Sequence, residues 1–264
     1  MYLYCNSLEL TLGFRPSEND AMLLHSYRCN ECRVPDILNT RIRDTLVFRG
    51  RTALHKLFLK KSYRYSEDLD FVQIREEPIG NLFTEIRKII KDTINTKPKY
   101  KLHEGRAILL YTYTAENPPH PLMKIKIEIN TREHCYYDPL NSKLLESYSQ
   151  WFQNTMDITT FTTEELLATK LRALYQRKKG RDLFDLWVAR ELNPNTKRVF
   201  VEIFKKYLNR EDKHITQGIF EKNIHEKVNS NQLAYDLRPL ISPSLGYDVH
   251  KAYDYVLENY IQKL

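Results

Sequence analysis

The spacing of apolar side chains changes along the chain, from a mixture of strand-like and helix-like segments to helical segments alone. A helix repeats its buried face every three to four residues and a strand every second residue, so the spacing identifies the element. The clearest strand pattern is at residues 123–129, where isoleucines alternate with charged residues. From about residue 160 the spacing is helical almost to the C-terminus. We therefore expect a mixed α/β part followed by a helical part.

The pattern also places most elements by residue range. We expect strands at residues 45–48, 68–74, 100–103, 106–114 and 122–130. We expect helices at residues 17–32, 52–59, 79–94, 199–208 and 249–264. A further helix should open at the capping box Thr162–Glu165 and stop at Gly180. These elements predict an α+β fold, with a mixed sheet and flanking helices at residues 1–157 and a helical domain at residues 158–264.

The composition is that of a globular protein of one large or two modest domains, with 264 residues of which 42% are hydrophobic. No apolar run approaches the roughly 20 residues that cross a bilayer, and no signal segment is visible, so we expect a cytoplasmic protein without membrane contact. The glycines lie too far apart for a Rossmann fingerprint or a Walker A loop. Cys29 and Cys32 lack a second pair of zinc ligands. The net charge of 41 − 34 = +7 suits a polyanionic partner without identifying one.

Two aspartates alternate on the strand predicted at residues 68–74. Because strand side chains alternate in direction, Asp68 and Asp70 share one face, while Leu69 and Phe71 point toward the core. Two adjacent carboxylates repel each other unless a cation lies between them. Magnesium prefers oxygen ligands and keeps waters for substrate phosphates, so it is the expected occupant. The structural alternative is a solvated strand edge or turn.

The strand at residues 122–130 supplies a third carboxylate by the same reasoning. Its isoleucines face the core, so Lys126 and Glu128 face the other way. If this strand neighbours the aspartate strand, Glu128 completes a cluster that can hold two cations and clamp the oxygens of a phosphoryl displacement. Nucleotide phosphates would then rest on the turn at Gly50, where a helix N-terminus and the Thr52 hydroxyl offer donors. Alternatively, Glu128 is a surface residue and Gly50 only a turn.

Two blocks of sequence resemble motifs of a known family. Gly50-Arg-Thr-Ala-Leu and Arg64-Tyr-Ser-Glu-Asp-Leu-Asp-Phe resemble the first motif of the bacterial AbiEii/AbiGii toxin-type nucleotidyltransferases. Residues 165–174 and 177–187 resemble the family's lysine motif and its R-D-x-x-D-L motif. These enzymes belong to the DNA polymerase β-like superfamily and are related to the MenT toxins.

The resemblance implies a nucleotidyltransferase-type sheet and the Mg²⁺-dependent (or Mn²⁺-dependent) transfer of a nucleotide from an NTP. It further implies an RNA acceptor, tRNA in particular, and a toxin neutralised by a cognate antitoxin. By motif position it implies metal ligands at Asp68, Asp70 and Glu128, which are also catalytic. It implies further catalytic residues at Lys170, Asp182 and Asp185. It implies nucleotide binding by Gly50, Arg51, Thr52 and Lys170.

Arg51 departs from the family pattern, which usually has Gly-Gly or Gly-Ser at this turn. Arginine does not enter positive φ as freely as glycine, so the turn is either shaped differently or gains a phosphate contact. The departure favours a second hypothesis, a nucleotidyltransferase-like module that binds nucleic acid or protein without turnover. The intact carboxylate set opposes that hypothesis. A third hypothesis is a nucleotidyltransferase whose acceptor is a protein or a small molecule, which would show transfer without added RNA.

A run of cations follows the lysine motif, with no acidic residue between residues 170 and 181. Given the resemblance, we expect a nucleic-acid backbone to be bound by Arg172, Arg177, Lys178, Lys179 and Arg181. The alternative is a basic face near a helix C-terminus, which the helix dipole stabilises without a ligand. Asp182 could likewise be a helix N-cap, and Asp185 could pair with Arg181 at i,i+4.

Overall fold

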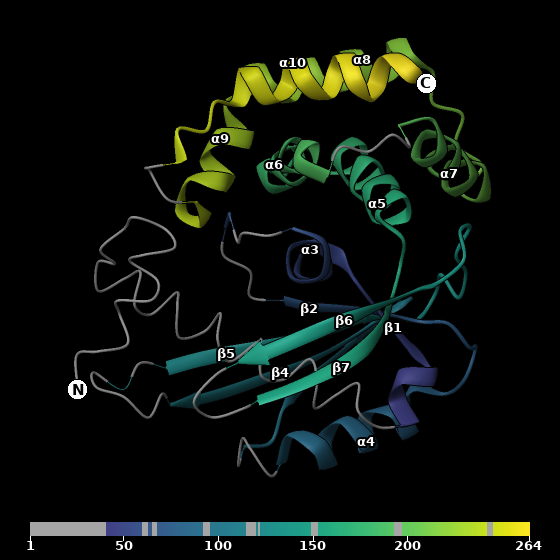
Figure 1. Ribbon diagram of the computed structural model, residues 1–264, viewed down its shortest axis with the longest axis vertical. Coiled ribbons are helices and arrows are strands. Elements are labelled where there is room, and N and C mark those ends of the chain that lie inside the picture. The colour runs from purple at the N-terminus through teal and green to yellow at the C-terminus, as the bar shows by residue number, and fades with distance from the viewer. Residues whose placement is uncertain are drawn as a thin grey trace.

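The computed structural model describes residues 41–59, 63–64, 68–91, 96–114, 120, 122–148, 153–192, 197–241 and 245–264. The helix predicted at residues 17–32 and the pair Cys29 and Cys32 lie outside these ranges. Within them, a sheet forms one layer and a group of helices forms a second layer over one face of that sheet (Figure 1). The predicted order, mixed α/β first and helical afterwards, is confirmed.

One mixed sheet of seven strands runs in the order β3-β4-β5-β2-β1-β7-β6. The strands are β1 (Leu46–Arg49), β2 (Asp68–Gln73), β3 (Lys99–His103), β4 (Arg106–Thr114), β5 (Leu122–Asn130), β6 (Asn141–Tyr148) and β7 (Gln153–Thr160). The pairs β2–β5 and β1–β7 are parallel, and the other neighbours are antiparallel. All five predicted strands are present. The condition set for Glu128 is also met, since β5 lies directly beside β2.

Strands β6 and β7 were not predicted from the hydrophobic pattern of the sequence. Their sequences are mostly polar, and among their side chains that the structure describes the buried apolar ones are Leu145 and Ile158. A strand that buries so few apolar residues shows no alternation from which it could be recognised. Strand β7 pairs with β1 and β6 pairs with β7, so β6 and β7 form the end of the sheet beyond β1 and do not adjoin the aspartate strand β2.

The two faces of the sheet differ in polarity. Leu69 and Phe71 on β2 and the isoleucines of β5 face a core that helix α4 (Ile79–Lys91) closes with Leu82, Ile86 and Ile90. The opposite face carries Asp68, Asp70, Lys126 and Glu128, and it is the face toward the helical layer (Figure 1). The strict alternation of each strand therefore decides which side chains meet the helices.

The helical layer contains α5 (Thr163–Gln176), α6 (Gly180–Val188), α7 (Lys197–Arg210), α8 (Gln217–Asn229), α9 (Gln232–Leu237) and α10 (Val249–Asn259). Between the layers, the turn after β1 starts α3 (Gly50–Ala53), which continues as the π-helical turn η2 (Leu54–Phe58). Short 3₁₀ turns are η1 (Arg41–Asp44), η3 (Ala189–Leu192), η4 (Arg238–Leu240) and η6 (Ile261–Lys263). Across the described residues, every helix is too short or too polar to cross a bilayer.

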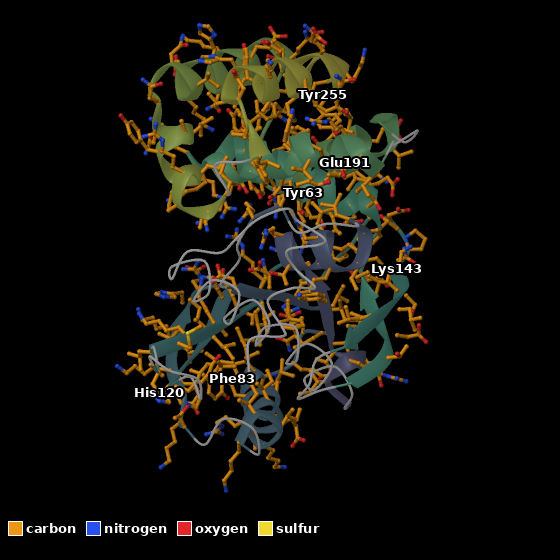
Figure 2. The ribbon with its side chains drawn as sticks, turned by 60° about the vertical axis from the view of Figure 1, so that its left-hand side comes forward. Tyr63, Phe83, His120, Lys143, Glu191 and Tyr255 are labelled. Carbon is orange, nitrogen blue, oxygen red and sulfur yellow. The ribbon has the colours of Figure 1, made fainter. Side chains whose placement is uncertain are left out.

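A shared core joins the two layers. Val47 and Val72 from the sheet pack in one cluster with Leu166, Phe184 and other residues of the helical layer. A polar contact also crosses between residues far apart in sequence: the Tyr63 hydroxyl donates a hydrogen bond of 2.5 Å to Glu191 Oε2, and Figure 2 shows these two side chains at the junction. The layers are therefore fixed to each other by packing as well as by the chain.

Gly180 begins a helix instead of ending one, which corrects the expectation from the sequence. Helix α5 already ends at Gln176, where the buried Lys227 ammonium donates hydrogen bonds to the carbonyls of Leu174 (2.5 Å) and Tyr175 (2.6 Å). Glycine is required at position 180 because a Cβ there would lie 2.7 Å from the carbonyl carbon of Leu233 in α9. Its role is close packing between helices, which sequence spacing does not reveal.

Candidate active site

Three carboxylates lie on the sheet face toward the helices. In the parallel pairing of β2 with β5, Asp70 stands opposite Glu128 and Asp68 stands opposite Lys126. Directly paired residues share a face, and so do residues two positions apart on one strand. The structure therefore brings Asp68, Asp70 and Glu128 together, as the alternation predicted.

Lys126 lies between two of these carboxylates. Its ammonium is 2.8 Å from Glu128 Oε2 and 3.3 Å from Asp68 Oδ2, and Arg106 Nη1 is 3.4 Å from Glu128 Oε1. Although burial opposes it, the contact with Lys126 and the charge of Arg106 lower the pKa of Glu128. Among the described residues no group of three acidic, histidine or cysteine side chains is arranged as a metal-binding cluster. The lysine holds the space between Asp68 and Glu128, so a metal role for all three carboxylates stays a prediction.

Asp70 has the most perturbed carboxyl group of this face. Burial, together with the charges of Asp68 and Glu128, raises the pKa of Asp70 to about 6, and the nearby Lys170 and Arg49 oppose that shift. When burial and neighbouring negative charges disfavour the ionised form of a carboxyl group, a cation bound beside it stabilises that form. The oxygen donors of Asp68 and Asp70 are also the ligand type that magnesium prefers. The donor set therefore fits a magnesium ion at this pair.

The turn at Gly50 lies directly against Asp70. Gly50 has a φ of 75°, and a Cβ at this position would lie 2.8 Å from the Cβ of Asp70. Glycine is thus required both by the left-handed backbone and by the close approach. Because the turn leads into α3, the backbone that could face a phosphate stands next to the carboxylate pair.

The side chains that follow Gly50 point elsewhere than expected. The Thr52 hydroxyl donates a 2.8 Å hydrogen bond to the main-chain carbonyl of Asp68, so its proton is not available to a phosphate. Arg51 is buried, and its charge contributes to lowering the pKa of His55. Both residues therefore build the turn from within. The contacts observed for Arg51 and Thr52 are structural ones, and their phosphate contacts stay a prediction.

A buried network fixes Lys170 above the carboxylates. The Lys170 ammonium is 2.9 Å from Asp185 Oδ2 and 3.7 Å from Asp182 Oδ1. Asp185 also accepts two hydrogen bonds of 2.8 Å from Arg64, and Asp182 accepts two, of 2.6 and 2.7 Å, from Arg177. The charges of Arg64 and Lys170 outweigh burial and hold the pKa of Asp185 well below its usual range.

The two aspartates of this network have no surface open to a substrate. Both are completely buried, so their observed contacts are those of residues that position Lys170, Arg64 and Arg177. Lys170 in turn lies close enough to Asp70 to oppose the rise of its pKa. The predicted lysine and aspartate motifs thus meet the carboxylate strand in space.

Two members of this network were not predicted. Arg64 belongs to a quoted motif, but its partner Asp185 is 121 residues away in the sequence. His55 is buried with Nε2 3.6 Å from Asp185 Oδ1, and burial lowers its pKa to about 4. The imidazole is therefore neutral at pH 7 and the contact is not an ion pair. Only the position of Arg64 four residues before Asp68 could have drawn attention to either residue.

The run of cations at residues 170–181 is opposed by acids from other elements. Arg172 is buried, with hydrogen bonds of 2.6 Å to Glu133 and 3.2 Å to Glu211, and it lies over the Tyr207 ring. Lys179 is 2.9 Å from Asp236. The observed contacts of Arg172 are therefore internal, with its charge paired and covered, and its nucleic-acid contact stays a prediction.

The other predicted nucleic-acid ligands differ in exposure. Arg177 is half exposed but forms an ion pair with Asp182, and Arg181 is partly buried. Lys178 is exposed to solvent. Sequence spacing could not foresee this outcome, because the opposing acids come from distant segments.

Comparison with known proteins identifies the family of this chain. The family model of the nucleotidyl transferase AbiEii toxins of type IV toxin–antitoxin systems matches residues 36–259. No curated protein matches the chain.

Solved structures similar to this chain share little of its sequence. MenT4, a nucleotidyltransferase toxin from Mycobacterium tuberculosis, aligns over 93% of this chain and 96% of its own, with 17% identity and a TM-score of 0.50. An antigenic nucleotidyltransferase-like protein from Paracoccidioides brasiliensis aligns over 69% of this chain and 88% of its own, with 17% identity and a TM-score of 0.41. The match to MenT4 concerns the fold, whereas the family model covers the whole described site. The chain thus belongs to the AbiEii family of nucleotidyltransferase toxins.

Proposed function

We propose that this protein transfers a nucleotide from an NTP to a hydroxyl of an RNA, tRNA being the proposed acceptor, in a reaction that requires Mg²⁺. We further propose that a cognate antitoxin neutralises it. The observation that carries the proposal is the meeting of Asp68, Asp70 and Glu128 on one sheet face, with the Gly50 turn against Asp70 and Lys170 nearby.

The reaction is a displacement at the α-phosphorus of the NTP. The acceptor hydroxyl oxygen forms a bond to this phosphorus while the bond to the β-phosphate oxygen breaks, so pyrophosphate leaves and the hydroxyl proton passes to solvent. Such transfers depend mainly on positioning and on neutralising charge, and no covalent nucleophile is needed. Magnesium or manganese, held by Asp68 and Asp70, supplies part of that neutralisation when bound.

The chain itself supplies the remaining positioning. Because Gly50 has no side chain, the backbone of its turn lies directly against Asp70, so a phosphate bound by this turn would be next to that carboxylate. The ammonium of Lys170, fixed by Asp182 and Asp185, presents a positive charge on the helical side of the same site. A triphosphate in this position would be placed between backbone donors and a fixed cation.

A label-transfer experiment tests this function. The protein is incubated with Mg²⁺, each α-labelled NTP in turn, and total cellular RNA. We expect label on a small RNA with the wild-type protein and at least about 100-fold less with Asp70→Asn, since a charged ligand that acts in the transition state is lost. Asp254→Asn, an exposed site on the outer helix α10, is the matched control and should keep full activity.

The other outcomes would replace the proposal. Label on protein that is independent of RNA would mean a protein acceptor. NTP binding without any transfer would mean a non-catalytic module. Equal RNA labelling by wild type and Asp70→Asn, with both folded, would contradict the assigned site.

A further inference from the structure

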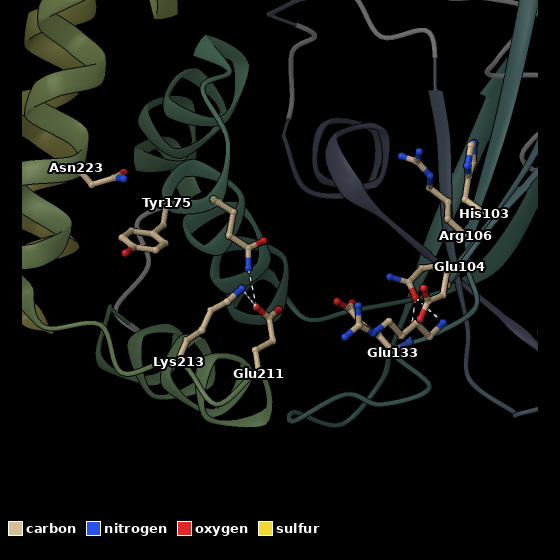
Figure 3. Close-up of a pocket in the computed structure, with 12 residues that line it drawn as sticks. His103, Glu104, Arg106, Glu133, Tyr175, Glu211, Lys213 and Asn223 are labelled. Atoms are coloured by element: carbon tan, nitrogen blue, oxygen red, sulfur yellow. Dashed lines mark hydrogen bonds and ion pairs between the residues drawn. The ribbon is translucent and has the colours of Figure 1, made fainter.

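A groove of about 960 Å³ opens between the sheet and the helical layer (Figure 3). On the sheet side it is lined by the β3–β4 turn with His103 and Arg106, and by Glu133 after β5. On the helical side it is lined by Tyr175 at the end of α5 and by Lys213 after α7. Figure 3 shows these two sets of side chains on opposite walls.

The groove is continuous with the candidate active site through Arg106. This residue lies in the groove wall and also contacts Glu128, which stands opposite Asp70 in the sheet. In the strand order, β5 and β4 lie on one side of β2, and β1 with the Gly50 turn lies on the other. Asp70 therefore separates the proposed triphosphate position from the groove.

The side chains of helix α5 are likewise divided between the proposed triphosphate side of the site and the groove. A helix turns by about 100° per residue, so Arg172 and Gln176 lie about 200° and 240° around the axis from Lys170. Lys170 faces the buried aspartates of α6, whereas Arg172 and Gln176 both contact Glu211, and Gln176 lines the groove. The two substrates of a transfer reaction must approach the reacting centre from different sides. This fold has two such sides, one at Lys170 and one at the groove.

A basic surface leads along the sheet into this groove. Lys99, Lys101 and His103 on β3 pair with Leu110, Ile108 and Arg106 on β4, and Ile108 pairs with Glu128 on β5. These residues therefore share the face of Asp70. On strands β3 to β5, this face carries five lysines and arginines against one acidic residue: Lys99, Lys101, Arg106, Lys124 and Lys126 against Glu128. Lys99, Lys101, Arg106 and Lys124 are exposed.

The side chains within the groove suit a single strand. Of its three acidic residues, Glu104, Glu133 and Glu211, the last two are paired with arginines, which removes much of their repulsion toward phosphates. Tyr175 offers an aromatic ring, and Asn223 offers an amide for base edges. Single-stranded RNA is bound by such combinations of backbone cations, stacking and hydrogen bonds to bases.

We propose that the acceptor RNA lies along the basic face of β3–β5 and that its single-stranded end enters this groove past Arg106. Its terminal hydroxyl then reaches Asp70 from the β5 side. This inference rests on the proposed function, and it specifies where that function's acceptor binds. It also identifies Lys99 and Lys101 as RNA-backbone contacts outside the carboxylate site.

The test uses the full chain with Lys99→Glu and Lys101→Glu combined. We expect the KM for RNA to rise by about tenfold or more while the KM for the NTP stays within about twofold, because the NTP binds on the other side of Asp70. Loss of two phosphate contacts should also reduce the slope of log affinity against log salt by about 1.4. The matched control is Lys222→Glu with Lys251→Glu, exposed lysines of the outer helices α8 and α10, which should behave as wild type.

A binding measurement separates this inference from the transfer activity. Fluorescence anisotropy with a labelled single-stranded oligoribonucleotide of about 12 residues reports RNA affinity without turnover. Weaker binding by the β3 variant than by the control supports the surface, even if wild type transfers no label. Unchanged RNA binding and KM would overturn it, as would a selective rise in the KM for the NTP. Matching thermal melting of the two double variants shows that both are folded.

Discussion

At the scale of single residues, Gly50 is the position where backbone and site chemistry depend on each other most directly. Its left-handed φ of 75° and the absence of a Cβ allow the turn to touch Asp70. We expect Gly50→Ala to lower transfer activity by about tenfold or more and to destabilise the fold by about 1–3 kcal/mol. Activity assays and urea unfolding measure both effects. Gly218→Ala in α8 is the control, because no atom lies near its added Cβ.

One result would contradict this role of Gly50. A Gly50→Ala protein with wild-type stability and transfer would show that the turn tolerates a side chain against Asp70. The control should be unchanged or slightly more stable, since alanine is favoured over glycine within a helix.

His55 should make stability depend on pH. Burial lowers its pKa to about 4, whereas an unfolded histidine titrates near 6.5. Below pH 6.5 the unfolded chain binds the proton first, so this residue lowers stability as the pH falls, by about 2 kcal/mol at pH 5. His55→Gln should remove that part of the pH dependence. Urea unfolding at pH 7.5 and pH 5 checks it.

The comparison between variants isolates His55 from other groups. Asp70, with its raised pKa, changes stability in the opposite direction but is present in every protein compared. His225→Gln, at an exposed position of α8, should keep the full wild-type pH dependence. An identical pH dependence in His55→Gln and wild type would contradict a buried neutral imidazole.

At the scale of elements, helix α5 contacts several other elements of the fold. Its N-terminus is capped by Thr162, whose side chain accepts a hydrogen bond from the Glu165 amide, as the capping box predicted. The Glu165 carboxylate, however, accepts hydrogen bonds from the amides of Tyr137 and Asp138 and from the Tyr207 hydroxyl. It thereby ties α5 to α7 and to the loop that follows β5.

Glu165→Gln should therefore destabilise the whole fold. The amide nitrogen of glutamine would face donors that need an acceptor, and unsatisfied buried groups cost about 1–3 kcal/mol. Glu164→Gln, in the same turn but partly exposed, should change stability by less than about 0.5 kcal/mol. Urea unfolding of both variants measures the difference. Equal stability of the two would mean that the Glu165 contacts add little.

At the scale of the whole molecule, the site exists because the helical layer covers one face of the sheet. The sheet supplies the carboxylates and the basic strands, and the helical layer supplies Lys170 and the second groove wall. The shared core around Val47, Val72 and Phe184 holds these layers together. The predicted division near residue 157 marks a change of secondary structure, but the cores on its two sides are joined by this cluster.

The sequence alone determined the features that follow from local periodicity. Alternation placed Asp68 with Asp70 and turned Glu128 to the polar face, because a strand has a period of two. The local pattern of apolar and β-branched residues identified five strands, and the capping box identified the start of α5. Polar β6 and β7 left no such pattern, so they were found only in the structure.

Tertiary structure decided everything that depends on which segments meet. It placed β5 beside β2, paired Arg64 with Asp185, and set Glu133 and Glu211 against Arg172. It also turned Thr52 and Arg51 inward and gave Gly180 a packing role. The physical reason is common to all of these: charges and close contacts act over a few ångströms in space, and partners separated by a hundred residues leave no local signal.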